Sequence, residues 1–336
     1  MAQQRCLLVV IDPTVDQQPA LEKAAALANK TGHELVLLGC VYDPYIAGDR
    51  FFDGSDLKDL RSGLMNETLT NLEKLANSHR NTGLEVACRA VWDTPLHEAI
   101  VREAIQFQPD IVFKDAHHHS MLSRALFTNT DWHLIRECPS TLWLAKQSKV
   151  AEREIVMAAV EPTHQHDEPA ALDQKIIEQA KVLSALFDDS PHLVHVYNVP
   201  TEAVISAYAP VPALASPPID YADNVNQVKK HHAEALEKLA RDAGLPEGRV
   251  HLRQGYPAEL LPDLAKELNA GVVVMGAVAR SRLKRVVIGS TAERTLDRFS
   301  CDIVVVKPDE FESPVDVQSD VTGFTEKTSY RDSVIG

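Results

Sequence analysis

The two halves of this 336-residue chain repeat the same order of sequence patterns. An apolar segment that ends in an acidic residue followed by Pro-Thr occurs twice, as CLLVVIDPT (6–14) and as IVMAAVEPT (155–163). Asp12 and Glu161 therefore occupy equivalent places. Later segments also match in pairs, among them ELVLLGCVYDP with HLVHVYNVP and DIVFKDA with GVVVMGAV. A repeat of this length indicates that one folding unit was duplicated, so the chain is predicted to contain two similar domains.

Each half alternates short apolar segments with amphipathic ones. The amphipathic segments have apolar residues at three- and four-residue spacing, which predicts helices. They cover 18–31, 56–80 and 96–107 in the first half, and 168–187, 221–243 and 258–269 in the second. The apolar segments are typical of strands buried on both faces of a parallel sheet. We predict an α/β fold of two Rossmann-like domains, each a five-stranded parallel sheet with strand order 3-2-1-4-5 and helices on both faces.

The domain boundaries are predicted from changes in composition along the chain. The first domain is expected to cover 1–150 and the second 151–308, with a polar stretch between them. Residues 309–336 form an acidic tail without periodicity, which we expect to be disordered. The closing strands, 140–145 and 302–307, are expected to join the two domains as an intramolecular pseudo-dimer, and a higher oligomer stays open.

Charge and cysteine usage limit the classes of partner and the compartment. The formal net charge of −14 argues against duplex nucleic acid and anionic membranes as general partners. Apolar runs stay shorter than the roughly eighteen residues of a membrane-spanning helix, so we expect no membrane span. The five cysteines form no C-x-x-C pair, and four of them fall in or beside apolar runs, which suits a reducing compartment. We expect a cytoplasmic protein.

A glycine-containing segment in the second half carries the most specific motif. The sequence VVVMGAVARSRLKRVVIGSTAERTL (272–296) resembles the phosphate loop of the universal stress proteins, G-x2-G-x9-G-[S/T]. Gly276 takes the first position, Ala279 the second, and Gly289-Ser290 the last pair. The acid after the first strand and the Val-Tyr pair of the second strand fit the same family in both halves. The resemblance implies an adenine nucleotide alpha hydrolase-like fold and a stress-response function without catalysis.

This resemblance implies a ligand site in the second domain. Parallel sheets bind ligands at the carboxyl ends of their strands, where glycine N–H groups and a helix N-terminus hold phosphate. Ala279 and Glu161 depart from the family's Gly and Asp, while Arg280 adds positive charge, so we expect a small phosphate-bearing ligand, ATP or another. A solvated loop whose glycines only form a turn stays open. The predicted contacts are Glu161, Val196, Gly276, Ala279, Arg280, Gly289, Ser290 and Thr291.

The first domain lacks the phosphate loop and carries histidines in its place. Lys114 is matched to Gly276, and no glycine follows Gly83 in the first 150 residues. His117 and His119 follow the fourth strand, and His133 lies near the start of the last helix. Imidazoles with a carboxylate such as Asp131 suit zinc, so these four residues are the predicted metal ligands, and a polar loop without metal is the alternative. His231 and His232, on the long helix of the second domain, are expected at the surface.

The sequence lacks the common catalytic motifs that would indicate an enzyme. The chain has no G-x-x-x-x-G-K-[ST] loop and no G-x-S-x-G nucleophile elbow, so we predict no catalytic residues. The sequence therefore favours a non-enzymatic tandem protein that binds a small molecule. Two alternatives stay open: a zinc-dependent or weakly nucleotide-hydrolysing enzyme, and a scaffold with vestigial pockets that binds a partner protein.

Overall fold

The structure, a computed structural model, divides the chain into two compact units. It describes residues 5–46, 54–116, 127–146, 154–163, 170–199, 221–277 and 295–317. Unit 1 comprises Met1–Arg153, Ala277–Ile288 and Ser300–Gly336, and unit 2 comprises Glu154–Gly276 and Gly289–Phe299. The last strand of the second repeat is thus part of unit 1, although the sequence repeat assigned it to the second domain.

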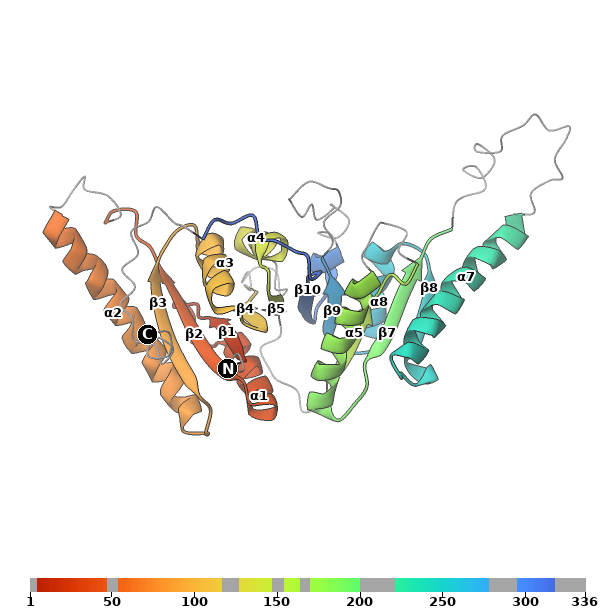
Figure 1. The fold of residues 1–336 in the computed structure, drawn as a ribbon, viewed down its shortest axis with the longest axis horizontal. Helices are drawn as coiled ribbons and strands as arrows, with labels where there is room; N and C mark the ends of the chain where they lie inside the picture. The colour runs from red at the N-terminus through yellow and green to blue at the C-terminus, as the bar shows by residue number, and fades with distance from the viewer. Residues whose placement is uncertain are drawn as a thin grey trace, which may run out of the picture. The chain divides into compact units, whose positions relative to one another are not determined.

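Unit 1 has a sheet whose strands follow the order β3-β2-β1-β4-β5-β10. The strands are β1 (Cys6–Val10), β2 (Glu34–Val41), β3 (Val86–Trp92), β4 (Ile111–Asp115), β5 (Thr141–Ala145) and β10 (Asp302–Val306). The helices are α1 (Pro19–Thr31), α2 (Gly54–Arg80), α3 (Leu96–Phe107) and α4 (Asn129–Glu137). β1 to β5 are parallel to their neighbours, and β10 pairs antiparallel with β5, so the two closing strands meet as expected. Helix α2 lies along β3, and α3 lies beside α4 (Figure 1).

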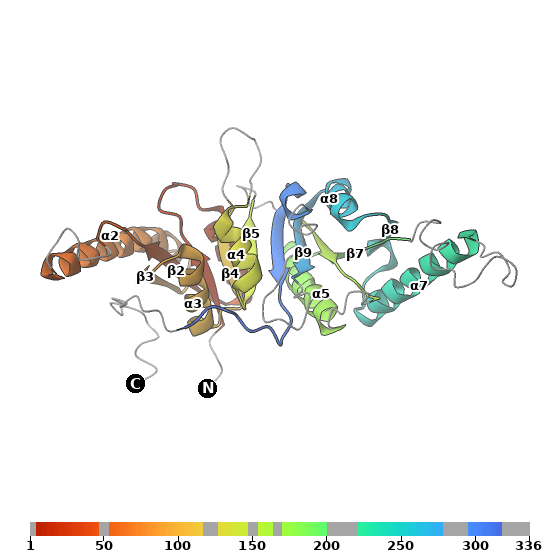
Figure 2. The same ribbon diagram turned by 90° about the horizontal axis from the view of Figure 1, so that it is seen from above.

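Unit 2 repeats this pattern with four parallel strands in the order β9-β6-β7-β8. The strands are β6 (Ile155–Ala159), β7 (His192–Tyr197), β8 (Val250–Gln254) and β9 (Ala270–Gly276). The helices are α5 (Ala170–Ser184), α7 (Tyr221–Asp242) and α8 (Pro257–Glu267). Helix α7 packs along β8, as α2 packs along β3 in unit 1, and both views show this (Figures 1 and 2). The α/β class of both predicted domains is therefore confirmed.

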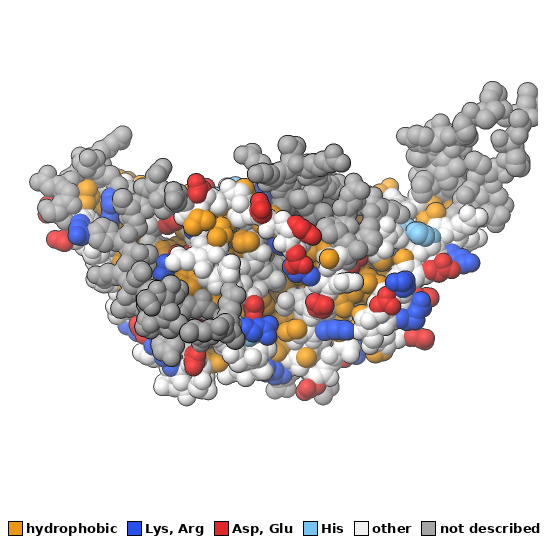
Figure 3. All heavy atoms as spheres, viewed as in Figure 1, with side chains coloured by type: hydrophobic (Ala, Val, Ile, Leu, Met, Phe, Trp, Pro, Cys, Tyr) orange, Lys and Arg blue, Asp and Glu red, His pale blue; other side chains and the backbone are white. Residues whose placement is uncertain are grey.

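The cores of both units come from strands that are buried on both faces. Every residue of β1, β4 and β10 is buried, and the side chains of β2 and β7 are mostly buried as well. Helices cover these strands with one face each. Over 225–242 of α7 the buried positions are His232, Leu236 and Ala240, four residues apart. The outward-facing surface of α7 alternates basic and acidic side chains, visible in Figure 3, with ion pairs such as Lys238–Asp242.

The strand registers shift the predicted correspondence between the two repeats by one residue. Val10 is paired with Lys114 in unit 1, and Ala159, the equivalent of Val10, is paired with Met275 in unit 2. Asp115, and not Lys114, therefore occupies the place of Gly276. The second strands shift in the same way: Val10 pairs with Leu38 and Ala159 with Val194, so that Val196 matches Cys40 instead of Val41.

The beginning of the C-terminal tail lies against unit 1. Residues 309–317 contain no helix or strand, but the Arg102 guanidinium donates a hydrogen bond to the carbonyl of Asp316 at 3.1 Å. The Lys307 ammonium lies over the ring of Phe311 at 4.3 Å. The rest of the tail lies outside the described residues. In the part of the chain that is described, none of the helices is long and apolar enough to cross a bilayer.

Candidate functional site

The carboxyl ends of three neighbouring strands bring together the described residues of the predicted ligand site. Because β9, β6 and β7 are adjacent and parallel, Gly276, Glu161 and Val196 lie at the same edge of the sheet. Val196 is 5% exposed, so its side chain belongs to the core. The other predicted contacts lie outside the described residues: Ala279, Arg280, Gly289, Ser290 and Thr291.

Glu161 is held in a tight turn at the end of β6. Its backbone N–H donates to Asp173 Oδ1 at 3.0 Å, and the Thr163 hydroxyl donates to Glu161 Oε1. Asp12 in unit 1 forms the same local turn, since the Thr14 N–H donates to Asp12 Oδ1 at 2.8 Å. The Glu161 side chain is 22% exposed, so its carboxylate is accessible to a ligand at this edge.

Gly276 lacks a side chain for a packing reason. A Cβ atom at this position would lie 2.7 Å from Leu172 Cδ2 and 3.2 Å from Ile176 Cδ1, both on α5. The contact with Leu172 would be shorter than real carbon atoms show and the one with Ile176 would be tight, so the glycine lets α5 approach the end of β9. The glycine thus places the start of the predicted phosphate loop directly beside the helix that follows Glu161.

Unit 1 has a cavity at the corresponding edge. Its volume is about 470 Å³, and it is bounded by the β1–α1 loop, the end of β2 and helix α2. The charged residues that line it are Asp12, Asp16 and Lys74. Burial raises the pKa of the Cys40 thiol, which also lines the cavity, so this thiol stays protonated. Two carboxylates against one ammonium make this cavity unfavourable for a phosphate group.

The end of β4 in unit 1 carries charged side chains where unit 2 has Met275 and Gly276. Asp115 Oδ1 accepts the backbone N–H of Ala20, near the start of α1, at 2.8 Å. Burial raises the pKa of the Asp115 carboxyl to about 6. The Lys114 ammonium donates to the Asp115 carbonyl at 2.9 Å and forms a buried ion pair with Asp131 at 2.8 Å. These side chains connect β4 to the helices of unit 1.

Asp131 has a structural role in place of the predicted role as a metal ligand. It is fully buried, and it forms a capping box with Thr128 at the start of α4. The Thr128 N–H donates to Asp131 Oδ2 at 2.7 Å, while Oδ1 faces the Lys114 ammonium. Both carboxylate oxygens are therefore occupied. His117 and His119 lie outside the described residues.

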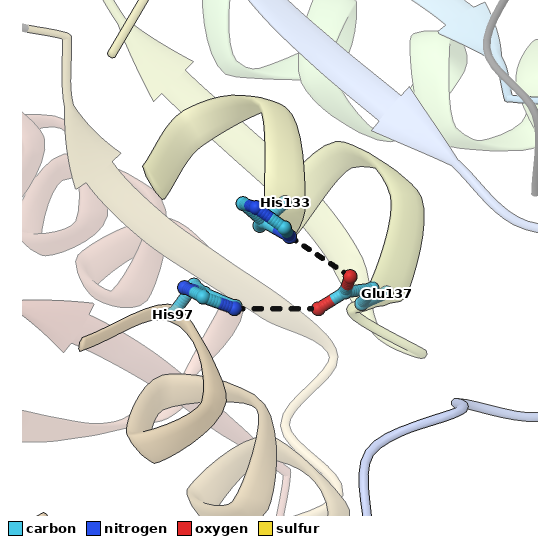
Figure 4. Close-up of side chains that lie close together, drawn as sticks. All are labelled: His97, His133 and Glu137. Atoms are coloured by element: carbon cyan, nitrogen blue, oxygen red, sulfur yellow. Dashed lines mark hydrogen bonds and ion pairs between the residues drawn. The ribbon is translucent and has the colours of Figure 1, made fainter. Parts of the chain in front are cut away.

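His133, the remaining predicted metal ligand, lies in a different cluster from the one expected. Its ring is stacked on that of His97, and Figure 4 shows the Glu137 carboxylate beside the edges of both rings. His133 Nδ1 donates to Glu137 Oε1 at 2.9 Å, and His97 Nε2 is 3.8 Å from Glu137 Oε2. Burial and the neighbouring His133 lower the pKa of His97. Helices α3 and α4 supply all three residues, which are partly exposed and close enough to share an ion.

Comparison with known proteins decides the family. The model of the universal stress protein family matches residues 5–146 and 166–307. The chain belongs to the universal stress protein family. It is 31% identical to universal stress protein E of Escherichia coli (strain K12) over 321 residues, which are 95% of this chain and 99% of that protein. Universal stress protein E of Photorhabdus laumondii is 29% identical over 94% of this chain and 98% of its own length.

A solved structure shows the same fold. The putative universal stress protein from Pseudomonas aeruginosa UCBPP-PA14 aligns with a TM-score of 0.70 and 26% identity, covering 93% of this chain and 96% of that one. The two family matches correspond to the two halves of the sequence repeat. This universal stress protein is therefore a tandem form, as predicted.

The sequence interpretation missed two histidines close to the acid of the second universal stress domain. His195 of β7 and His232 of α7 are 1% and 2% exposed, and their ring nitrogens Nε2 and Nδ1 are 2.8 Å apart. His232 was expected at the surface, but only its neighbour His231 is exposed. The helical spacing to Leu236 and Ala240 is a sequence signal that places His232 on the buried face.

Proposed function

We propose that this protein is a non-enzymatic cytoplasmic stress-response protein that binds a small phosphate-bearing ligand, ATP or another, in its second domain. The proposed contacts come from the edge of the unit 2 sheet and from the loop between β9 and β10. They are Glu161, Val196, Gly276, Ala279, Arg280, Gly289, Ser290 and Thr291. The proposed domains are those of the sequence repeat, 1–150 and 151–308, followed by the tail 309–336, although β10 belongs to unit 1 in the structure.

The observation that supports this proposal is the strand order β9-β6-β7 in unit 2. It brings the first glycine of the loop to the same edge as Glu161, although more than a hundred residues separate them in the sequence. A glycine-containing loop that begins at such an edge and ends before a helix presents backbone N–H groups to a phosphate. Arg280 adds a positive charge to this loop within an acidic chain.

Titration calorimetry with ATP tests the proposal, using one glycine in the loop and one outside it. Gly289→Val should weaken ATP binding at least about tenfold, because a branched Cβ shields the N–H groups that face the phosphates. Gly248→Val is the matched control, since a Cβ at Gly248 meets no atom within 4 Å. Equal ATP affinity of Gly289→Val and the unmodified chain would contradict the proposal, as would binding that the first domain supplies.

The first domain is proposed not to bind nucleotide phosphates. Asp12 and Asp16 line its cavity, and Asp115 takes the place of the loop glycine. We also propose that ATP turnover is negligible. A coupled phosphate-release assay measures this directly, and sustained release that depends on Glu161 would favour the alternative of a weak nucleotide hydrolase.

A zinc site in the first domain stays a proposal, now built around a different set of residues. The cluster of His97, His133 and Glu137 supports it, because two imidazoles and a carboxylate suit zinc and are close enough to share one ion. His117 and His119 remain candidates for the same ion. The replacements His97→Gln and His133→Gln should each lower the zinc content of the dialysed protein, and unchanged content would leave the cluster as a contact between α3 and α4.

A further inference from the structure

We infer that unit 2 contains a second, separate site for a transition metal ion of the zinc class, held by Glu161, His195 and His232. Each of these residues offers one ligand atom, and the three atoms lie within 4.8 Å of one another. Two imidazole nitrogens and one carboxylate oxygen form a ligand set that zinc prefers over magnesium or calcium. Three protein ligands leave the fourth tetrahedral position for water or another small ligand.

The ring orientation of His195 is already that of a metal ligand. Its Nδ1 donates to the carbonyl oxygen of Val160 at 3.1 Å, which leaves the lone pair of Nε2 facing His232 Nδ1. Metal-binding histidines commonly donate their second ring nitrogen to a backbone carbonyl in this way. In the metal-free protein the two facing nitrogens share one proton across 2.8 Å, and a metal ion would take the place of that proton.

The second imidazole is fixed by packing. The ring of His232 is stacked on that of Tyr197 with a centroid distance of 4.8 Å, and on that of His195 at 5.0 Å. His195 and Tyr197 belong to a buried strand and His232 to a long helix, so both imidazoles are presented by rigid elements. Burial lowers the pKa of both histidines, which favours the neutral imidazole, the form that binds metal.

Glu161 supplies a negatively charged ligand and lies where a metal ion can approach the site. Its Oε2 atom is 3.8 Å from His195 Nδ1, and the side chain is partly exposed while the two histidines are almost fully buried. An ion can therefore approach from the sheet edge and meet the carboxylate first. Nitrogen–zinc distances of about 2.0–2.1 Å require the two facing nitrogens to separate by roughly half an ångström, and the carboxylate to move toward them. Thr163 donates to the Oε1 atom, so Oε2 is the oxygen expected to move toward the facing nitrogens.

Unit 1 cannot form this site, because the equivalent positions carry other residues. The strand registers place Gly39 where unit 2 has His195. A Cβ atom at Gly39 would lie 2.6 Å from Thr68 Cγ2, so Gly39 faces Thr68 on α2 as His195 faces His232 on α7. Glycine and threonine offer no imidazole. The inferred site is thus specific to unit 2 and does not depend on the phosphate loop.

Cobalt titration of the full chain, after treatment with a chelator, tests the inference. Tetrahedral cobalt with nitrogen ligands absorbs in the visible range, and zinc competes for the same site. We expect His232→Gln and His195→Gln each to lose one equivalent of bound metal relative to the unmodified chain. His231→Gln, the same change at the exposed neighbouring position of α7, should keep the full stoichiometry. The His97→Gln and His133→Gln variants should also keep the unit 2 equivalent.

Glu161→Gln keeps the inference testable if the histidine variants fail to fold, which far-UV circular dichroism would show. This change leaves the buried imidazole pair intact and removes a ligand at the exposed end. It should weaken zinc binding at unit 2 at least about tenfold, because loss even of a residue that supports a ligand costs ten- to a hundredfold. If Glu161→Gln binds cobalt and zinc with unchanged stoichiometry and affinity, the site does not exist, and the two histidines are a buried hydrogen-bonded pair.

Discussion

Asp302, the first residue of β10, is the centre of a buried polar network in unit 1. Its carboxylate forms an ion pair with the Lys23 ammonium of α1 and accepts hydrogen bonds from Trp143 Nε1 at 2.8 Å and from the Lys146 N–H at 2.9 Å. Asp302 is 0% and Lys23 4% exposed. The network connects β10, which comes from the second sequence repeat, to the helix and strand of the first. We predict that Asp302→Asn strongly destabilises unit 1.

The expected loss follows from what remains after the change. An asparagine has one acceptor oxygen and one NH2 group, and each carboxylate oxygen it replaces faces at least one N–H donor. The Lys23 ammonium would stay buried without its ion-pair partner. Breaking a buried ion pair by removing one partner typically costs about 3–5 kcal/mol. The double variant Lys23→Met with Asp302→Asn should be less destabilised than Asp302→Asn alone, by about 1 kcal/mol or more, because the unpaired charge is gone.

Tryptophan fluorescence during urea unfolding measures this loss selectively. All three tryptophans, Trp92, Trp132 and Trp143, belong to unit 1, so their emission follows this unit while circular dichroism follows both. Asp59→Asn, on the exposed face of α2, is the control, with an expected change within about 0.5 kcal/mol. A loss below about 1 kcal/mol for Asp302→Asn, or a double variant at least as unstable as the single one, would refute the reasoning.

Three further changes test other contacts. Gly276→Ala should lower the free energy of unfolding of unit 2 by about 1–3 kcal/mol, because the added Cβ atom overpacks against Leu172. Urea unfolding followed by circular dichroism measures this loss, and no loss would show that α5 adapts. Thr128→Ala removes half of the capping box of α4 and should lower the free energy of unfolding of unit 1 by about 1–2 kcal/mol, measured by tryptophan fluorescence. An unchanged stability would mean that Asp131 caps α4 alone. Because the pKa of Asp115 is about 6 in the folded chain and 3.8 ordinarily, the native state binds its proton more tightly. Stability should therefore fall by about 2 kcal/mol as the pH rises from 4 to 6, and Asp115→Asn should remove this fall; equal pH profiles would contradict the shift.

The strands and the repeat could be predicted because each shows as a pattern of residues that are neighbours in the sequence. Apolar runs bounded by turn residues mark the strands, and the Pro-Thr turns after Asp12 and Glu161 mark equivalent loops. The register between strands could not be predicted in the same way. A strand buried on both faces does not alternate polar and apolar residues, so a slip of one residue leaves no trace in the sequence. This is why Lys114 was matched to Gly276, although the backbone pairing selects Asp115.

The place of β10 and the roles of the polar residues depend on contacts between distant parts of the chain. The segment 302–306 reads as an ordinary closing strand, and the sequence does not show that Asp302 will meet Lys23, far away in the chain. Asp131 was predicted as a metal ligand because it lies near histidines in the sequence. The same sequence also indicates a capping box, since Thr128 is followed three residues later by an acid at the start of a helix. The four-residue spacing of His232, Leu236 and Ala240 is likewise a sequence pattern that places His232 on the buried face of α7.

The two domains carry different residues at equivalent positions of the repeat. In unit 1, Gly39 lets α2 approach β2, and the nearby cavity is lined by Asp12 and Asp16. In unit 2, His195 at the same register position faces a second imidazole on α7 beneath Glu161. A substitution at one strand position thus changes what the edge can bind, while the parallel ladder and the turn around the strand-one acid stay the same. A metal ion at Glu161 would also add positive charge at the edge proposed for the phosphate-bearing ligand, so zinc should strengthen the binding of that ligand in the second domain and leave the first domain unaffected. Calorimetry with ATP at zero and saturating zinc measures this coupling, and it should be absent in His232→Gln.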